Sequence, residues 1–133
     1  EKKMSLQVAA FNMSMEDYGL YVILSLPLGD TTLSAIRDEI DEEVEKIQSD
    51  LISEKDYKKL LNKFESDFVD SNGSVEGIAN SLAEYYTIYG DTDLINSEID
   101  IYRSITREEI REVANKYLKP NQRLTLNYLP ESN

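Results

Sequence analysis

Residues 106–130 read TREEIREVANKYLKPNQRLTLNYLP and carry the clearest local structural signals in the sequence. Thr106 and Glu109 form a capping box, which predicts that a helix begins directly after Thr106. Apolar residues then recur at helical spacing: Ile110, Val113, Ala114, Tyr117 and Leu118. The run Lys119-Pro120-Asn121 predicts the end of this helix. Residues 122–129 alternate in polarity and predict a strand with Leu124, Leu126 and Tyr128 on one face.

Two further strands are predicted near the other end of the chain. Alternation between Leu6 and Phe11 indicates a half-buried strand, and residues 18–27, rich in β-branched and aromatic side chains, indicate an antiparallel partner. Residues 12–17 are predicted as the connection between them. Pro27, Gly29 and Asp30 predict the end of the second strand.

Four amphipathic helices are predicted between the strands and residue 106. The first has a continuous apolar stripe: Leu33, Ile36, Ile40, Val44, Ile47 and Leu51. Ser53 is the expected N-cap of the second, whose apolar side holds Tyr57, Leu60, Leu61, Phe64 and Phe68. Ser74 is the expected N-cap of the third, which should end near Gly90 with its inward side formed by Val75, Ile78, Ala79, Leu82 and Tyr86. Asp93 should begin the fourth, which carries Leu94, Ile95, Ile99 and Tyr102.

The predicted order is therefore β-β-α-α-α-α-α-β, an α+β fold with helices packed on one face of a small antiparallel or mixed sheet. The length suits a single domain over residues 1–133, or the C-terminal part of one larger α+β domain. Because three strands make a small sheet, we expect either further strands from outside this sequence or an edge left open for pairing. The start at Glu1 without an initiator Met suggests a fragment or a processed product.

Composition excludes several classes of function. The chain has no histidine and no cysteine, so it lacks the usual general base, the thiolate nucleophile and the commonest transition-metal ligands. Its net charge of −12 disfavours binding to nucleic acid and to anionic membranes. No apolar run approaches the roughly 20 residues needed to cross a bilayer, so we expect a soluble protein with no membrane insertion. The compartment stays open between bacterial cytoplasm and periplasm.

An acidic helix face and a polar turn are the first candidate sites. The acidic face comprises Asp38, Glu39, Asp41, Glu42, Glu43 and Glu45. It could bind cations or a basic peptide, but such runs are usually solvated helix faces. Residues 70–73, Asp-Ser-Asn-Gly, resemble the centre of a calcium loop, yet Phe68 and Ala79 stand where that loop needs acidic ligands. A helix-ending turn is the better interpretation.

Tyr85, Tyr86 and Tyr89 form a cluster among nine tyrosines. They could contact a peptide, since tyrosine supplies both apolar area and a hydrogen bond. The plainer expectation is that Tyr86 and Tyr89 lie on the buried side of the third helix. Neither a Gly-x-Ser-x-Gly elbow nor a phosphate-cradling glycine-rich loop occurs in the sequence.

Residues 104–130 combine a Thr start, an acidic helix ending in Ala-x-x-Tyr-Leu, a Pro-Asn turn and a predicted final strand ending in Pro130. This pattern resembles the closing segment of domains of the pitrilysin/insulinase family of zinc metallopeptidases, which includes the processing peptidases. Residues 74–90 and the turn from Tyr18-Gly19 into the second strand resemble upstream parts of the same domains. The resemblance implies the C-terminal part of a noncatalytic α+β domain, from a parent protein that hydrolyses peptide bonds with zinc.

The resemblance assigns no catalytic, cofactor-binding or metal-binding residue to this chain. Active members carry a His-x-x-Glu-His helix for zinc, and nothing here matches it. Noncatalytic domains often present an Arg and a Tyr to the substrate just before the region matched by residues 1–7, which contain Lys2, Lys3, Leu6 and Gln7 instead. Zinc is therefore expected only in the catalytic domain of the parent protein.

The implied role is a structural element and part of the wall of a peptide-binding chamber. Its expected partners are the catalytic domain or subunit, which activates water on zinc, and the peptide substrate, which can add as a strand at a sheet edge. Two alternatives stay open: a stand-alone protein-interaction domain of the same fold, and a truncated piece of the catalytic domain. If the chain is a fragment, exposed sheet edges also predict self-association or strand exchange.

Overall fold

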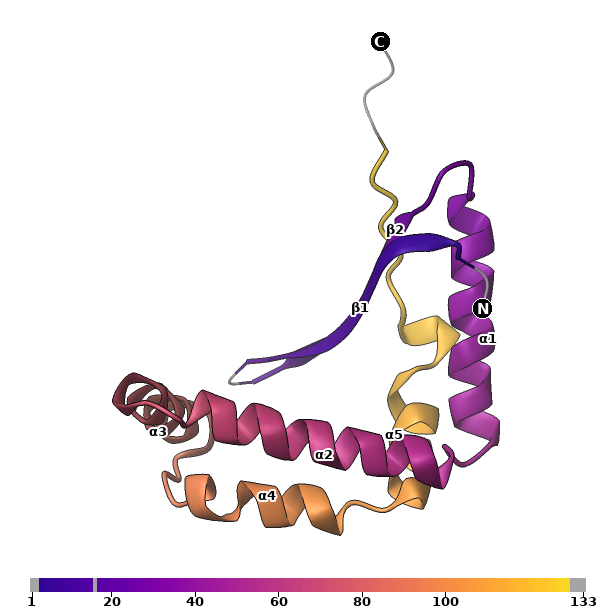
Figure 1. The fold of residues 1–133 in the computed structure, drawn as a ribbon. Coiled ribbons are helices and arrows are strands. Elements are labelled where there is room, and N and C mark those ends of the chain that lie inside the picture. Colours follow the sequence, from indigo (N-terminus) through magenta and orange to yellow (C-terminus); the bar gives the residue numbers. More distant parts are fainter. Residues whose placement is uncertain (1–2, 16, 130–133) are drawn as a thin grey trace. The chain divides into compact units, whose positions relative to one another are not determined.

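The structure is a computed structural model that describes residues 3–15 and 17–129. The element order is β1 (Ser5–Ser14), β2 (Gly19–Pro27), α1 (Leu33–Ser49), α2 (Glu54–Ser71), α3 (Val75–Tyr89), α4 (Leu94–Ser104), α5 (Arg107–Tyr117) and the 3-10 turn η1 (Pro120–Gln122) (Figure 1). The α+β class and the order of the two strands and five helices are confirmed. Glu1, Lys2 and Pro130 lie outside the described residues.

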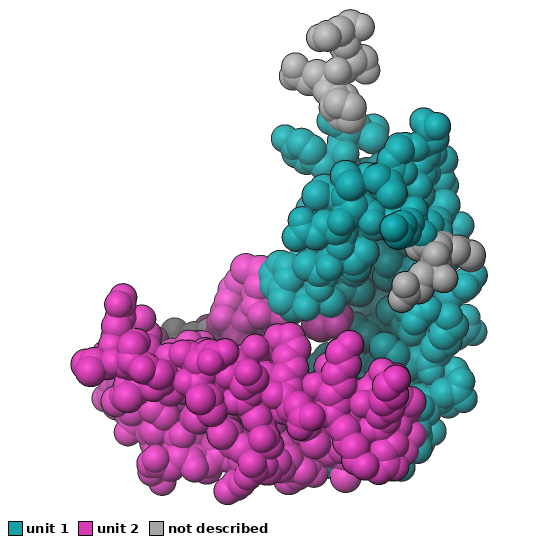
Figure 2. Space-filling model, viewed as in Figure 1, with its two compact units in different colours: residues 1–11, 22–51, 108–133 teal, residues 12–21, 52–107 magenta. Residues whose placement is uncertain are grey.

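The chain divides into two compact units (Figure 2). Unit 1 contains residues 1–11, 22–51 and 108–133, so it holds the base of the hairpin, α1, nearly all of α5 and the segment after η1. Unit 2 contains residues 12–21 and 52–107, and so holds the hairpin tip with α2, α3 and α4.

The two strands form a hairpin with a short turn. β1 runs on to Ser14, three residues further than predicted, and the Met15 amide donates to the Tyr18 carbonyl (2.8 Å) at the turn. At the base, the Leu28 amide donates to the Met4 carbonyl (3.0 Å). Residues joined in this way lie opposite each other in an antiparallel pair, so even-numbered residues of both strands share one face at this end.

The helices begin where side chains can replace missing backbone partners. Ser53 Oγ accepts from the Asp56 amide (3.0 Å) and Ser74 Oγ from the Gly77 amide (3.0 Å), as predicted. Thr32 caps α1 in the same way, through the Ala35 amide (3.2 Å). α4 follows Asp93 and α5 follows Thr106, again as predicted. Gly90 ends α3 with φ +70°, a conformation that strongly favours glycine.

Unit 1 is held by α1 and α5. Ile36 of α1 and Ala114 of α5 are the buried apolar residues of the described chain, at 7% and 4% exposure. The predicted apolar stripe from Leu33 to Ile47 lies among the less exposed positions of α1, and Leu51 follows the end of the helix and is also half-buried. Gln48 Nε2 donates to the carbonyls of Ala114 (3.1 Å) and Leu118 (3.0 Å), and the Ala114 carbonyl also accepts from the Leu118 amide (2.9 Å).

Unit 2 packs α2, α3 and α4 against one another. The Phe64 and Tyr102 rings stack with centroids 4.6 Å apart, joining α2 to α4. Tyr57 Oη donates to the Ile105 carbonyl (2.5 Å), and Arg107 Nε donates to the Ile52 carbonyl (2.6 Å). These bonds join the start of α2 to the residues that follow the end of α4.

The prediction of a strand over residues 122–129 is wrong, because these residues do not form a strand in the structure. Pro120–Gln122 forms a 3-10 turn, and residues 123–129 have no regular structure. Leu124 and Leu126 are each 83% exposed and Tyr128 is 99% exposed. Alternation alone does not make a strand, because a strand also needs a neighbour for its backbone hydrogen bonds, and the sheet of the described residues contains only β1 and β2.

The inward side predicted for α3 is correct at Leu82 and wrong at its other members, Val75, Ile78, Ala79 and Tyr86. Val75 is 86% exposed, Ile78 41% and Tyr86 68%, while Leu82, Tyr85 and Ile88 are half-buried. Gly77 explains the rotation: a Cβ there would lie 1.9 Å from the Ser71 carbonyl oxygen. The helix therefore approaches its neighbour through a glycine, a contact that a search for apolar stripes ignores.

Candidate functional site

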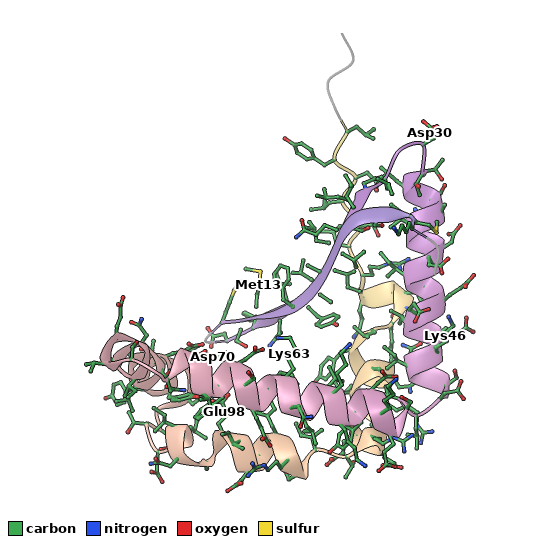
Figure 3. The ribbon with its side chains drawn as sticks, in the orientation of Figure 1. Met13, Asp30, Lys46, Lys63, Asp70 and Glu98 are labelled. Carbon is green, nitrogen blue, oxygen red and sulfur yellow. The ribbon has the colours of Figure 1, made fainter. Side chains whose placement is uncertain are left out.

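The acidic face of α1 is partly engaged in ion pairs. Lys46 Nζ contacts Glu43 Oε1 at 2.6 Å, and this hydrogen bond raises the pKa of Lys46. Arg123 makes a two-bond contact with the Asp41 carboxylate, which raises the pKa of the guanidinium. Lys46 lies near the C-terminal end of α1 (Figure 3). Acidic residues of this face thus form one ion pair within α1 and another that holds Arg123 against the helix.

The residues present do not fit a zinc site. Zinc in proteins takes mainly cysteine, histidine and carboxylate ligands, usually four in structural sites and three plus water in catalytic ones. The sequence offers only carboxylates, and within residues 3–15 and 17–129 no three of them come together in a way that could hold a metal ion.

Residues 70–73 form a helix end, as predicted. Asp70 lies in the last turn of α2 (Figure 3), and Asn72 caps the helix with its amide (3.1 Å) and its Nδ2 (3.0 Å) both donating to the Phe68 carbonyl. The Oδ1 atom of Asn72 is buried without a hydrogen-bond partner. This turn leads directly into Ser74, the cap of α3, so its geometry is explained by the connection of two helices.

The tyrosines separate into one structural residue and two exposed ones. Tyr85 is half-buried and its hydroxyl donates to the Glu98 carboxylate of α4. Burial, and then the charge of Glu98, raise the pKa of the nearby Tyr102 hydroxyl. The expectation that Tyr86 and Tyr89 are buried is wrong, since they are 68% and 58% exposed. The cause is the rotation of α3 at Gly77.

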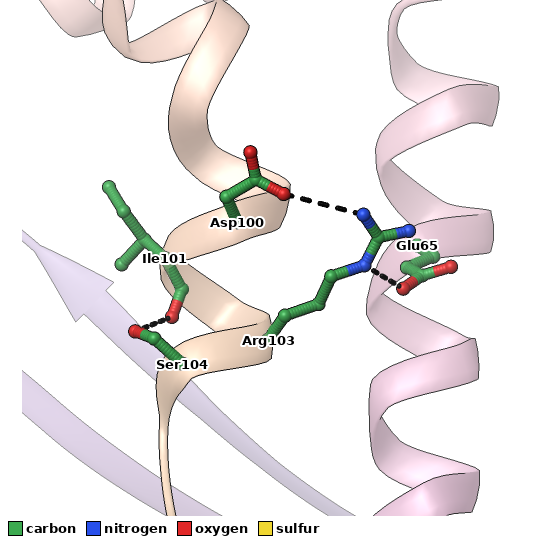
Figure 4. Close-up of polar contacts among 5 residues, drawn as sticks. All are labelled: Glu65, Asp100, Ile101, Arg103 and Ser104. Carbon is green, nitrogen blue, oxygen red and sulfur yellow. Dashed lines mark hydrogen bonds and ion pairs between the residues drawn. The ribbon is translucent and has the colours of Figure 1, made fainter.

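Arg103 joins α4 to α2 through charge. Its Nε contacts Glu65 at 2.8 Å and its Nη1 contacts Asp100 at 3.3 Å (Figure 4). The hydrogen bond to Arg103 lowers the pKa of Glu65, and the same bond raises the pKa of Arg103. All three side chains are at least 37% exposed, so solvent weakens these attractions. The cluster joins two helices through one guanidinium and two carboxylates.

An uncovered sheet face is the most unusual surface of unit 1. Its residues are the even-numbered apolar ones at the hairpin base: Leu6 (72% exposed), Val8 (62%), Leu24 (47%) and Leu26 (46%). The odd face differs, because Ser5, Ala9 and Ser25 are half-buried there and the Ser5 and Ser25 hydroxyls bond at 2.8 Å. One side of the hairpin is thus covered and the other is apolar and open.

The open surface carries no charge, although 30% of the chain is charged. Residues 4–15, 18–29 and 124–129 contain no Asp, Glu, Lys or Arg. Depletion of charge together with exposed apolar side chains is typical of the centre of a protein interface. Reasoning from motifs missed this surface, although the spacing of charges along the sequence was sufficient to find it.

Comparison with known proteins finds zinc proteases. The chain is 25% identical over 129 residues to the zinc protease PqqE of Helicobacter pylori, a match that covers 95% of the chain and 28% of that protein. A solved protease from Helicobacter pylori superimposes with a TM-score of 0.82 and 20% identity, covering 90% of this chain and 29% of that one. No protein-family model matches.

A second solved structure is the inactive peptidase domain of a Bordetella parapertussis protein described as a zinc protease. Its TM-score is 0.85 at 19% identity, covering 97% of this chain and 68% of that one. The fold is therefore that of the peptidase domains of zinc proteases. These similarities to zinc proteases agree with the resemblance to zinc metallopeptidases inferred from residues 104–130. The chain spans less than a third of the length of the Helicobacter pylori proteins.

Proposed function

We propose that this chain is a noncatalytic segment of a pitrilysin/insulinase-like zinc metallopeptidase. The observation that carries the proposal is the combination of a zinc-protease fold with a sequence that has no histidine or cysteine. A described neighbour of the same fold is an inactive peptidase domain, which shows that this architecture exists without chemistry in another protein. The role of the chain is then to supply structure and surface.

The partner in this proposal is a catalytic domain or subunit of the same peptidase. That partner holds zinc, whose chemistry is the activation of a water for attack on a peptide bond. The chain contributes part of the wall of the peptide-binding chamber. Its open, uncharged hairpin is a suitable wall element because extended peptides can add to exposed sheet edges through backbone hydrogen bonds.

The charge of the chain gives the proposed chamber a substrate preference. With a net charge of −12, a wall formed by this chain attracts basic peptides and repels acidic ones. The peptidase should therefore cleave a neutral or basic peptide faster than its acidic counterpart, and the difference should shrink as salt is added. A cleavage profile with no disadvantage for acidic peptides at low salt would refute this preference.

Two alternative functions predict different positions for the zinc-binding motif in the coding sequence. In a stand-alone interaction domain of the same fold, no His-x-x-Glu-His accompanies the chain. In a piece of the catalytic domain, that motif lies in the same domain. The exposed, uncharged surface is also what an interaction domain would use to bind a partner, and it therefore supports the first alternative too. Reading the coding sequence around these residues for the motif separates the three possibilities.

A reconstitution experiment tests the proposal directly. Peptide hydrolysis is measured for the purified chain, for the His-x-x-Glu-His polypeptide encoded with it, and for the two together, each with and without a zinc chelator. We expect no hydrolysis by the chain alone, and chelator-sensitive hydrolysis by the pair that exceeds that of the catalytic polypeptide alone. Chelator-sensitive hydrolysis by the chain alone would overturn the proposal.

A further inference from the structure

We draw no further inference here: the strongest candidate, the exposed and uncharged face at the base of the β1–β2 hairpin formed by Leu6, Val8, Leu24 and Leu26, carries none, because the chain spans less than a third of the Helicobacter pylori proteins that it matches and nothing in the structure shows what covers this face.

Discussion

Gln48 and Asn115 cap each other's helices in unit 1. Gln48 Nε2 donates to the Ala114 and Leu118 carbonyls at the end of α5, and Asn115 Nδ2 donates to the Gln48 carbonyl at the end of α1 (2.8 Å). The last carbonyls of a helix lack partners in the helix itself, although the Ala114 carbonyl also accepts from the Leu118 amide. Two amide side chains therefore join α1 to α5 across 67 residues of sequence.

Removing either amide should loosen unit 1. Gln48→Ala should lower the free energy of unfolding by about 1 to 3 kcal/mol, the usual cost of leaving partly buried polar groups without partners, and Asn115→Ala, at an exposed bond, by about 0.5 to 1 kcal/mol. Because Gln48→Ala keeps the main-chain carbonyl that Asn115 bonds, the two substitutions remove separate bonds and the double variant should lose about the sum of the two single losses. Chemical denaturation of all four proteins measures these losses. A double variant as stable as either single variant would contradict the two separate bonds.

Gly77 should resist replacement even by alanine. A Cβ at this position would meet the Ser71 carbonyl at 1.9 Å, so Gly77→Ala should destabilise the protein by about 1 to 3 kcal/mol, although alanine is the better helix former. Asn80→Ala, at an exposed position of the same helix, is the control and should be neutral or slightly stabilising. Thermal denaturation that ranks Gly77→Ala as the more stable variant would refute the close approach.

The Tyr57 hydroxyl should contribute to the stability of unit 2. Tyr57→Phe removes the bond to the Ile105 carbonyl and should cost about 0.5 to 1.5 kcal/mol. Tyr86→Phe is the matched control, because Tyr86 is 68% exposed, and should have no measurable effect on unfolding. Equal effects of the two substitutions in urea denaturation would be inconsistent with the structure.

Glu65 should make stability depend on pH in a defined direction. Arg103 lowers the pKa of Glu65 below its ordinary value of 4.5, so folding favours the ionised carboxylate. Its contribution is present above pH 4.5 and is lost as the pH falls through the lowered pKa. Glu65→Gln should therefore reduce the melting temperature at pH 7 and have little effect at pH 3, whereas Glu112→Gln on α5 should not show this loss. A constant Glu65→Gln difference at both pH values would exclude the ion pair.

Local signals in the sequence predicted most of the fold. The helix starts after Ser53, Ser74 and Thr106 were correct because caps are short-range features that tertiary packing seldom overrides. The α1 stripe was correct because it repeats over five turns. The hairpin was found in outline, although its turn is tighter than expected, because Met15 and Tyr18 close it directly.

The predictions that were wrong concern elements whose structure depends on a neighbouring segment. Residues 123–129 have the pattern of a strand, but the described residues provide no strand beside them. The α3 side was misassigned because Gly77, a residue without a side chain, makes the closest approach. The open surface at Leu6 and Val8 was missed because motif searches look for residues that are present, whereas this surface is marked by charges that are missing.

In the proposed role, this chain supplies surface and no chemistry to a zinc peptidase. Native mass spectrometry of the purified chain in the presence of zinc, with peptide hydrolysis followed in the same samples, is the decisive experiment for this proposal. We predict only weak, non-stoichiometric zinc binding and no chelator-sensitive hydrolysis, because the sequence has no histidine or cysteine. One tightly bound zinc per chain together with chelator-sensitive hydrolysis would contradict the account.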